Sequence, residues 1–183
     1  MHLRSTAISG LTIIESNRTA DARGSFSRLY CDRELAPILQ GESIVQINHS
    51  VTRRVGAIRG LHFQHPPAAE IKIVRCLRGE VFDVAVDLRA GSPSFLAWFG
   101  LALGGDTDRA IAIPAGFAHG FQVLQPDSEL LYLHSAHYSP EHEGGLRYDE
   151  PKINIEWPLD VTELSGRDNS HAPMSGDFAG ISL

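Results

Sequence analysis

Residues 59–75 read RGLHFQHPPAAEIKIVR and predict two strands separated by a proline break. Side chains along a strand point alternately to opposite faces of a sheet, so Leu61 and Phe63 share one face while His62 and Gln64 share the other. Because Gly60 has no side chain, we expect the face that carries His62 to leave room for a ligand.

The second of these strands, over residues 71–77, places Lys72 on one face with Val74 and Cys76. A lysine with apolar neighbours either extends to water or is held in a pocket for its charge. A later stretch, residues 113–121 (IPAGFAHGF), places His119 after a tight turn of proline and glycine. We expect the two stretches to line one pocket that binds an anion and moves protons.

The same two-residue alternation extends over most of the chain. We expect further strands over residues 11–14, 26–30, 43–51, 81–88, 96–103, 110–113, 120–124 and 130–137. A short helix is predicted over 32–40, with an aspartate start, Pro37 near its first turn and Gly41 as a stop. Antiparallel strands in this number, without long helices, predict an all-β fold, a double-sheet jelly roll of the cupin type.

The chain of 183 residues is long enough to bury one hydrophobic core, and we expect a single domain over residues 1–183. Its core is predicted over about residues 43–138, preceded by an N-terminal arm, 1–42, and followed by an irregular C-terminal segment, 139–183. In that last segment only Ile153, Ile155 and Trp157 have the spacing of a strand.

Composition excludes several classes of partner. The formal net charge of -6 favours neither nucleic acid nor an anionic membrane, so an anionic ligand must be held by a local cluster of basic side chains. Cys31 and Cys76 lack metal-ligand spacing and fit a reducing compartment. The first residues hold no long apolar run, so we expect a cytoplasmic protein without a signal peptide or membrane span.

Two kinds of chemistry are compatible with a histidine-bearing jelly roll. The spacing of Pro114, Gly116 and His119 is similar to the second motif of metal-binding cupins, but His62 is followed by Phe63 and Gln64 instead of a second histidine. The ligand set is therefore incomplete, and we expect no catalytic metal.

The alternative is acid/base catalysis without a metal. His62 is the candidate base, because histidine titrates near neutral pH, and Tyr132 is a candidate proton donor on the strand over 130–137. Lys72 or Arg59 would hold a developing oxyanion. Each of these residues taken alone is more commonly a packing or surface residue of a strand.

Several motifs taken together resemble the dTDP-4-dehydrorhamnose 3,5-epimerase family. They are RGLHFQ (59–64), KIVR (72–75), GEVFDVAVDLR (79–89), SPSF (92–95), IPAGFAHGF (113–121) and IEWP (155–158), with DARG (21–24) and QIN (46–48) upstream. The resemblance runs in order from about residue 10 to residue 170. It implies a jelly-roll homodimer that acts without a cofactor on a nucleotide-linked 4-keto-6-deoxy-hexose in deoxysugar biosynthesis.

The resemblance also implies roles for four catalytic residues. His62 matches the base, and Asp168, within LSGRD (164–168), matches the aspartate paired with it. Tyr132 matches the acid on the opposite face of the sugar ring, and Lys72 matches a lysine that supports the enolate oxygen.

The remaining matches concern substrate binding. Arg59, Asp83 and His119 match residues that line the same pocket, as do Gln46 and Asn48, while Arg23 and Phe26 match positions that reach the nucleotide from the neighbouring subunit. Arg28 and His137, which precedes Tyr138, depart from the family at positions associated with the nucleotide base, and Glu70 replaces a family glutamine.

Three alternatives stay open at this level. The chain could invert C3, C5 or both, it could be a mono-epimerase that acts on a sugar carried by another nucleotide, or it could be a cupin that binds a sugar nucleotide without catalysis. A metal-dependent cupin isomerase or oxygenase is the remaining class.

Overall fold

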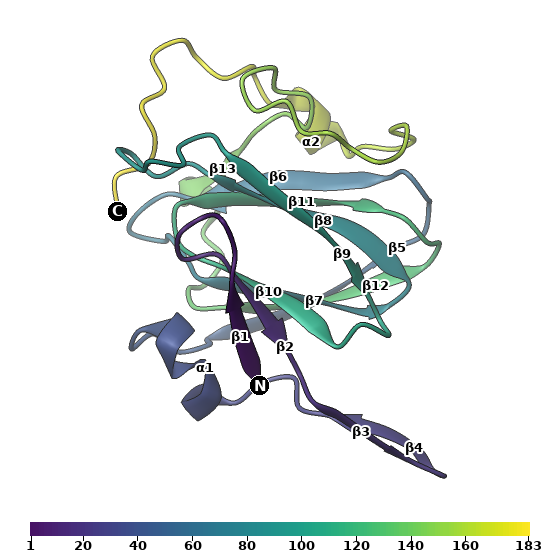
Figure 1. Cartoon of the computed structure of the whole chain (residues 1–183). Helices are drawn as coiled ribbons and strands as arrows, with labels where there is room; N and C mark the ends of the chain where they lie inside the picture. The colour runs from purple at the N-terminus through teal and green to yellow at the C-terminus, as the bar shows by residue number, and fades with distance from the viewer.

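Two antiparallel sheets form a sandwich in the computed structural model, which describes all of residues 1–183 (Figure 1). The six-stranded sheet has the order β1 (His2–Ser5), β2 (Thr12–Glu15), β10 (Arg109–Ile113), β7 (Lys72–Arg78), β12 (Ser128–His134) and β5 (Gln46–Thr52). The five-stranded sheet has the order β13 (Glu143–Gly145), β6 (Ile58–Gln64), β11 (Phe117–Val123), β8 (Glu80–Asp87) and β9 (Trp98–Gly104). The predicted all-β jelly roll is confirmed.

Few elements lie outside the two sheets. They are the hairpin of β3 (Arg18–Asp21) and β4 (Gly24–Ser27), which projects from the sandwich in Figure 1, the helices α1 (Asp32–Leu39) and α2 (Gly166–Ser170), and the 3-10 turn η1 (Pro140–His142). No helix has the length and apolar character needed to cross a membrane.

Two expected details of the segment over residues 26–40 differ from the structure. Pro37, expected near the first turn of the helix, lies inside α1 beyond that turn. The helix tolerates it because α1 is short and is held by its buried face, Leu35 and Leu39, which packs on the six-stranded sheet. The strand expected over 26–30 ends at Ser27, because its only partner, β3, begins at the residue opposite, Arg18.

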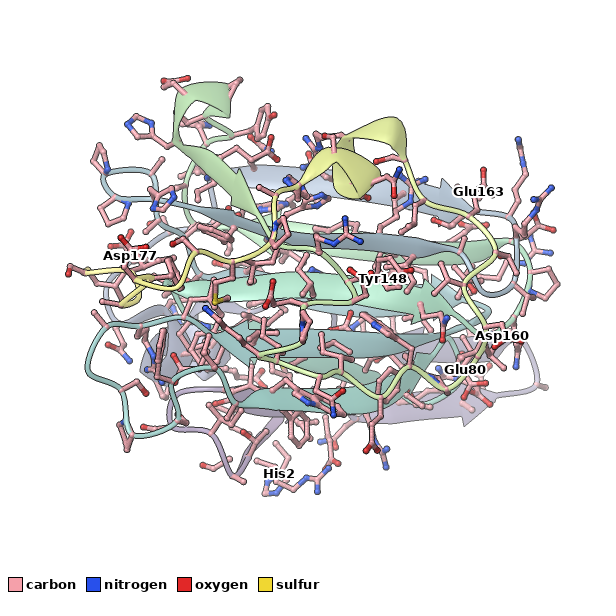
Figure 2. All side chains as sticks on the ribbon, turned by 90° about the horizontal axis from the view of Figure 1, so that it is seen from above. His2, Glu80, Tyr148, Asp160, Glu163 and Asp177 are labelled. Carbon is pink, nitrogen blue, oxygen red and sulfur yellow. The ribbon has the colours of Figure 1, made fainter.

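The five-stranded sheet is buried on both faces. In β8, Val81 and Ala85 join the core between the sheets, whereas Val84 and Val86 join a second cluster on the outer face. The C-terminal segment covers that outer face, and Figure 2 shows the chain that carries Tyr148, Asp160 and Asp177 crossing the sheet.

The cover is not a strand. Ile153 is buried and Ile155 and Trp157 pack beside it, but the strand expected there is absent and only turns and extended chain occupy these positions. Trp157 Nε1 donates to the carbonyl of Tyr148 at 2.9 Å, so side chains and not a sheet ladder anchor the segment. The spacing of these three apolar residues therefore reflects their burial under the segment and not a strand.

The six-stranded sheet includes residues that precede the core expected over residues 43–138. β1 is the edge strand of the six-stranded sheet and β2 lies between β1 and β10, and Ile14 packs with Leu35 and Leu39 of α1 in a third apolar cluster. The N-terminal residues therefore contribute to the core, and only the β3–β4 hairpin has the character of an arm.

A glycine is required at position 60 for a reason other than the one expected. Its φ is +114°, and a Cβ there would lie 2.7 Å from both Gly120 Cα and the His119 carbonyl oxygen. The missing side chain therefore allows β6 and β11 to approach each other where their register shifts between His119 and Phe121. It makes no room for a ligand, although His62 does face a cavity, as described below.

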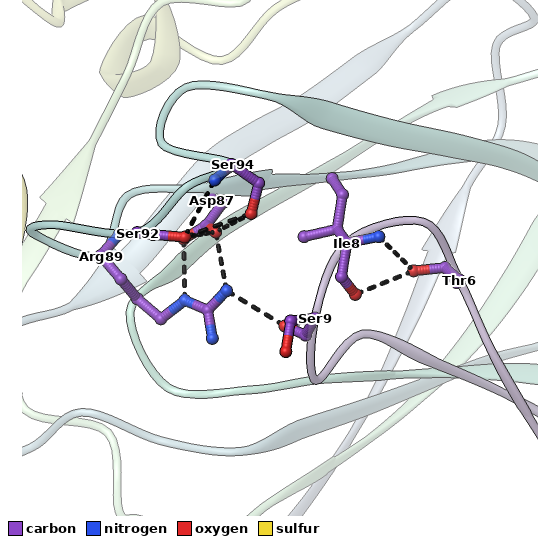
Figure 3. A network of polar contacts seen from close by, with 7 residues as sticks. All are labelled: Thr6, Ile8, Ser9, Asp87, Arg89, Ser92 and Ser94. Carbon is purple, nitrogen blue, oxygen red and sulfur yellow. Dashed lines mark hydrogen bonds and ion pairs between the residues drawn. The ribbon is translucent and has the colours of Figure 1, made fainter.

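Asp87, the last residue of β8, is the centre of a buried polar network (Figure 3). Its carboxylate accepts from Arg89 Nε at 2.8 Å and Nη2 at 2.7 Å, and from the hydroxyls of Ser92 and Ser94, each at 2.6 Å. Arg89 Nη2 also donates to the Ser9 carbonyl at 3.0 Å. Burial by itself would raise the pKa of Asp87, but these donors lower it to about 2.

We predict that Asp87→Asn lowers the free energy of unfolding by about 3 kcal/mol, because it leaves Arg89 without its buried carboxylate. Because the pKa of Asp87 is lowered, its carboxylate contributes roughly 2 kcal/mol of stability at any pH above its ordinary pKa of 3.8. This contribution is lost as the pH falls from 3.8 towards about 2. Urea unfolding across this pH range measures both effects.

The matched control is Asp149→Asn, which removes a carboxylate from an exposed pair with Arg147. It should change stability by less than about 1 kcal/mol. Equal effects of the two variants would contradict a special role for the Asp87 network.

Candidate active site

A cavity of about 550 Å³ opens between the two sheets beside α2, within the size range of small-molecule sites. Its lining comes from β5, β7 and β12 of one sheet, β6 and β11 of the other, and α2. The predicted residues that it brings together are Gln46, Asn48, Arg59, His62, Lys72, His119, Tyr132, Tyr138 and Asp168.

His62 and Asp168 are in direct contact in this cavity. His62 Nε2 lies 2.7 Å from Asp168 Oδ1, and the backbone N–H of Gly60 donates to Asp168 Oδ2 at 3.3 Å. Burial alone would raise the pKa of Asp168, but the hydrogen bond and charge of His62 bring it below its ordinary value. A carboxylate only accepts, so Nε2 carries the proton of this bond, and Nδ1 is the nitrogen left free to take another.

The short helix α2 positions this carboxylate. Ser165 caps the helix, and its hydroxyl accepts from the backbone N–H of Asp168 at 3.0 Å. From the same turn, Arg167 Nη2 reaches to 3.0 Å from His62 Nε2 and its Nη1 pairs with Glu143 at 2.8 Å. The C-terminal segment thus brings a carboxylate and a guanidinium to the imidazole of β6.

Tyr132 enters the cavity from the opposite sheet. Its hydroxyl lies 3.0 Å from Ser50 Oγ, and its ring stacks on His134 with the centroids 6.2 Å apart. Burial, with a smaller contribution from the charge of Asp83, raises the pKa of Tyr132 well above its ordinary value. The phenol therefore keeps its proton at physiological pH.

His119 and Asp83 form a second imidazole–carboxylate pair, deeper in the fold. His119 Nε2 lies 2.9 Å from Asp83 Oδ2, and the carboxylate is fully buried with Oδ1 lacking a hydrogen-bond partner. The His119 ring meets the Tyr132 ring edge-on at 6.3 Å. Asp83 does not line the cavity itself but holds the ring of His119, which does.

Glu70 connects two basic residues of the cavity. Its carboxylate lies 3.3 Å from Lys72 Nζ and 2.8 Å from His134 Nδ1, while Asn48 Nδ2 lies 3.3 Å from His134 Nε2. Burial would raise the pKa of Glu70, but the hydrogen bond from His134 and the charge of Lys72 lower it, so the group is a carboxylate. The sequence offers no reason for a glutamate at position 70. In the structure, Glu70 joins Lys72 and His134 in one network of ion pairs and hydrogen bonds.

Five predicted binding residues do not line the cavity: Asp83, which lies behind His119, and four residues outside the site. Arg23 pairs with Asp21 at 2.6 Å on the projecting hairpin, and Phe26 near its tip is 73% exposed. Arg28 pairs with Glu34 of the α1 region. The side chain of His137 also lies outside the lining, although its carbonyl accepts from Gln64 at 3.3 Å.

Sequence reasoning missed five other residues at this site, namely Ser50, His134, Glu143, Arg167 and His171. Strand parity could have found Ser50, which follows Asn48 by two residues, and His134, which follows Tyr132 by two. The others depend on how the C-terminal segment crosses the sheet, and no periodic pattern encodes that path.

Comparisons with known proteins agree with this geometry. Residues 5–175 match the profile of the dTDP-4-dehydrorhamnose 3,5-epimerase family. The chain is 39% identical to an enzyme of that name from Sinorhizobium fredii over 94% of this chain and 89% of the relative. It is 40% identical to a dTDP-4-dehydrorhamnose 3-epimerase from Streptomyces niveus, over 92% and 81%.

A solved structure extends the likeness to three dimensions. The dTDP-6-deoxy-D-glucose-3,5-epimerase of Legionella pneumophila, in complex with dTDP-4-keto-L-rhamnose, superimposes with a TM-score of 0.88 and 39% identity. The match covers 92% of this chain and 90% of that one.

Proposed function

The chain belongs to the dTDP-4-dehydrorhamnose 3,5-epimerase family, and we propose that it inverts C3, C5 or both of a nucleotide-linked 4-keto-6-deoxy-hexose through an enolate. The observation that carries the proposal is the His62–Asp168 pair facing a cavity that Tyr132 enters from the opposite sheet. Inversion needs a base and an acid on opposite faces of one ring, and we assign these roles to His62 and Tyr132, which lie on facing sheets.

The chemistry follows from the ketone at C4. The protons on C3 and C5 become removable when a cation stabilises the oxygen of the enolate that forms. His62 takes the proton on Nδ1, and the Asp168 carboxylate stabilises the imidazolium. Tyr132 returns a proton to the other face, and the carbon centre is inverted with no change of oxidation state, so the proposal requires no redox cofactor.

Lys72 is proposed to stabilise the enolate oxygen. An ammonium group has three N–H donors, and the contact with Glu70 uses one of them. Two remain for a substrate oxygen at the cavity floor. Arg59, held by Thr52 Oγ1 at 2.8 Å and the Val51 carbonyl at 3.3 Å, is proposed to bind the diphosphate of the substrate.

We also propose that two chains form a dimer in which each β3–β4 hairpin serves the neighbouring site. Val45, Ile47 and Val51 form an apolar stripe on the outer face of the edge region around β5, with exposed fractions of 44%, 62% and 44%. The hairpin carries the exposed Phe26 and Arg23 away from the cavity of its own chain. A second copy would cover the stripe and supply the missing nucleotide contacts.

His62→Asn should reduce turnover by about 10²- to 10⁴-fold, the usual contribution of a general base. The measurement is deuterium incorporation from heavy water into a 4-keto-6-deoxy sugar nucleotide, with NMR to assign C3 or C5. His65→Asn, outside the cavity on the same segment, is the matched control and should keep its rate. If His62→Asn retained more than about a tenth of the activity, His62 would not be the base.

Tyr132→Phe should separate exchange from inversion. The variant keeps the ring that stacks on His134 but lacks the hydroxyl that returns the proton. Deuterium should still enter from the side of His62, and the recovered sugar should keep its original configuration. Equal losses of exchange and inversion would indicate that Tyr132 acts through packing alone.

Ile47→Asp should weaken dimerisation at least about tenfold, which is 1.4 kcal/mol, because it buries a charge in the proposed interface. Sedimentation velocity over a range of protein concentrations measures this. Leu159→Asp alters another exposed apolar residue, on the C-terminal cover, and should leave the dimer intact. A monomeric wild-type protein would refute the proposed dimer.

A further inference from the structure

A second histidine, His171, lies beside the proposed His62–Asp168 pair and has no part in the proposed reaction. Each of the three residues offers a ligand atom, and these atoms lie within 4.8 Å of one another. The rings of His62 and His171 meet edge-on with their centroids 6.3 Å apart. His171 Nε2 is buried and has no hydrogen-bond partner.

The fold holds the His171 ring in this place. His171 is the C-cap of α2, and its ring lies directly over Gly145, where a Cβ would come within 2.1 Å of Nε2. Gly145 is in turn the partner of His62 in the pairing of β13 with β6. A glycine at this register position therefore allows the second imidazole to lie next to the first.

The donor set has a definite metal preference. Two imidazoles and one carboxylate suit zinc and similar divalent transition metals, which an N₂O set binds well. An unpartnered nitrogen next to a histidine–carboxylate pair is the arrangement that a metal ion completes.

We propose that His62, Asp168 and His171 form a site for a divalent transition-metal ion such as Zn²⁺, and that the ion inhibits the enzyme. Binding breaks the hydrogen bond between His62 Nε2 and Asp168, releases the Nε2 proton to solvent, and replaces it by bonds from the metal to both groups and to His171. The pair can then no longer move the substrate's proton. The inhibition rests on the proposed function, whereas metal binding does not.

One charge opposes the ion. Arg167 Nη2 lies 3.0 Å from His62 Nε2, and a cation bound there would repel the guanidinium. The Arg167 side chain is half exposed, so it can move into solvent when the metal enters. Removal of this guanidinium should therefore strengthen metal binding, which an incidental surface histidine site would not show.

Calorimetric titration with Zn²⁺ in a non-chelating buffer tests the site. The wild type should bind one ion per chain, His171→Ala should weaken binding at least about tenfold, and Arg167→Ala should tighten it. His171→Phe keeps a ring over Gly145 and should lose binding as well. His2→Ala, at the distant edge of the other sheet in Figure 2, is the control and should bind as the wild type does.

The second measurement is deuterium exchange with increasing Zn²⁺, with each variant compared to its own metal-free rate. The inhibitory concentration should rise at least about tenfold in His171→Ala, and a chelator should restore the wild-type rate. The proposal is overturned if the wild type binds no zinc, or if both His171 variants bind it and are inhibited as the wild type is. Zinc binding that depends on His171, in a protein without epimerase activity, would refute the function and leave the metal site standing.

Discussion

The hydrogen bond between His62 and Asp168 connects a regular strand, which the sequence pattern predicts well, to the irregular C-terminal segment, which it does not predict. His62 lies on a regular strand in the middle of the sandwich, whereas Asp168 lies 106 residues later on a five-residue helix. The bond can form only because the C-terminal segment is fixed over the outer face of the five-stranded sheet by Ile153, Trp157 and Ile181. The packing of that cover is therefore a requirement for the proposed chemistry and not only for stability.

Carboxylates paired with bases recur throughout the cavity. His62 has Asp168, His119 has Asp83, and His134 shares Glu70 with Lys72. A buried charge is strongly unfavourable unless it is paired and hydrogen-bonded, so each base brings its own partner into the fold. This explains how a chain of net charge -6 can present imidazole, ammonium and guanidinium groups to an anionic substrate. Asp83 lies behind His119, whereas Glu70 and Asp168 line the cavity beside the basic groups that they pair with.

The fold class and the cavity-facing sides of the strands could be predicted because both depend on a local period of two. Gln46 and Asn48 of β5, and Lys72 of β7, face the cavity as parity requires. Gly60 was explained wrongly because its reason is the close approach of Gly120, a contact between strands that alternation does not contain. His171 and Arg167 were missed for the same kind of reason. Their positions depend on the path of an irregular segment, which long-range packing determines.

The outer face of β5 shows how parity and function combine. In most half-buried strands the apolar face turns towards the core, but here Gln46, Asn48 and Ser50 turn inwards and Ile47 and its apolar neighbours turn outwards. A polar interior suits the charged sugar nucleotide that we propose binds between the sheets. The exterior of β5 is apolar and exposed, and the hairpin holds Arg23 and Phe26, the proposed nucleotide contacts, away from the cavity of the same chain. In the proposed dimer, the docking of a second copy would cover the apolar face and supply these contacts, so the proposed site and the proposed dimer both follow from the reversed polarity of β5.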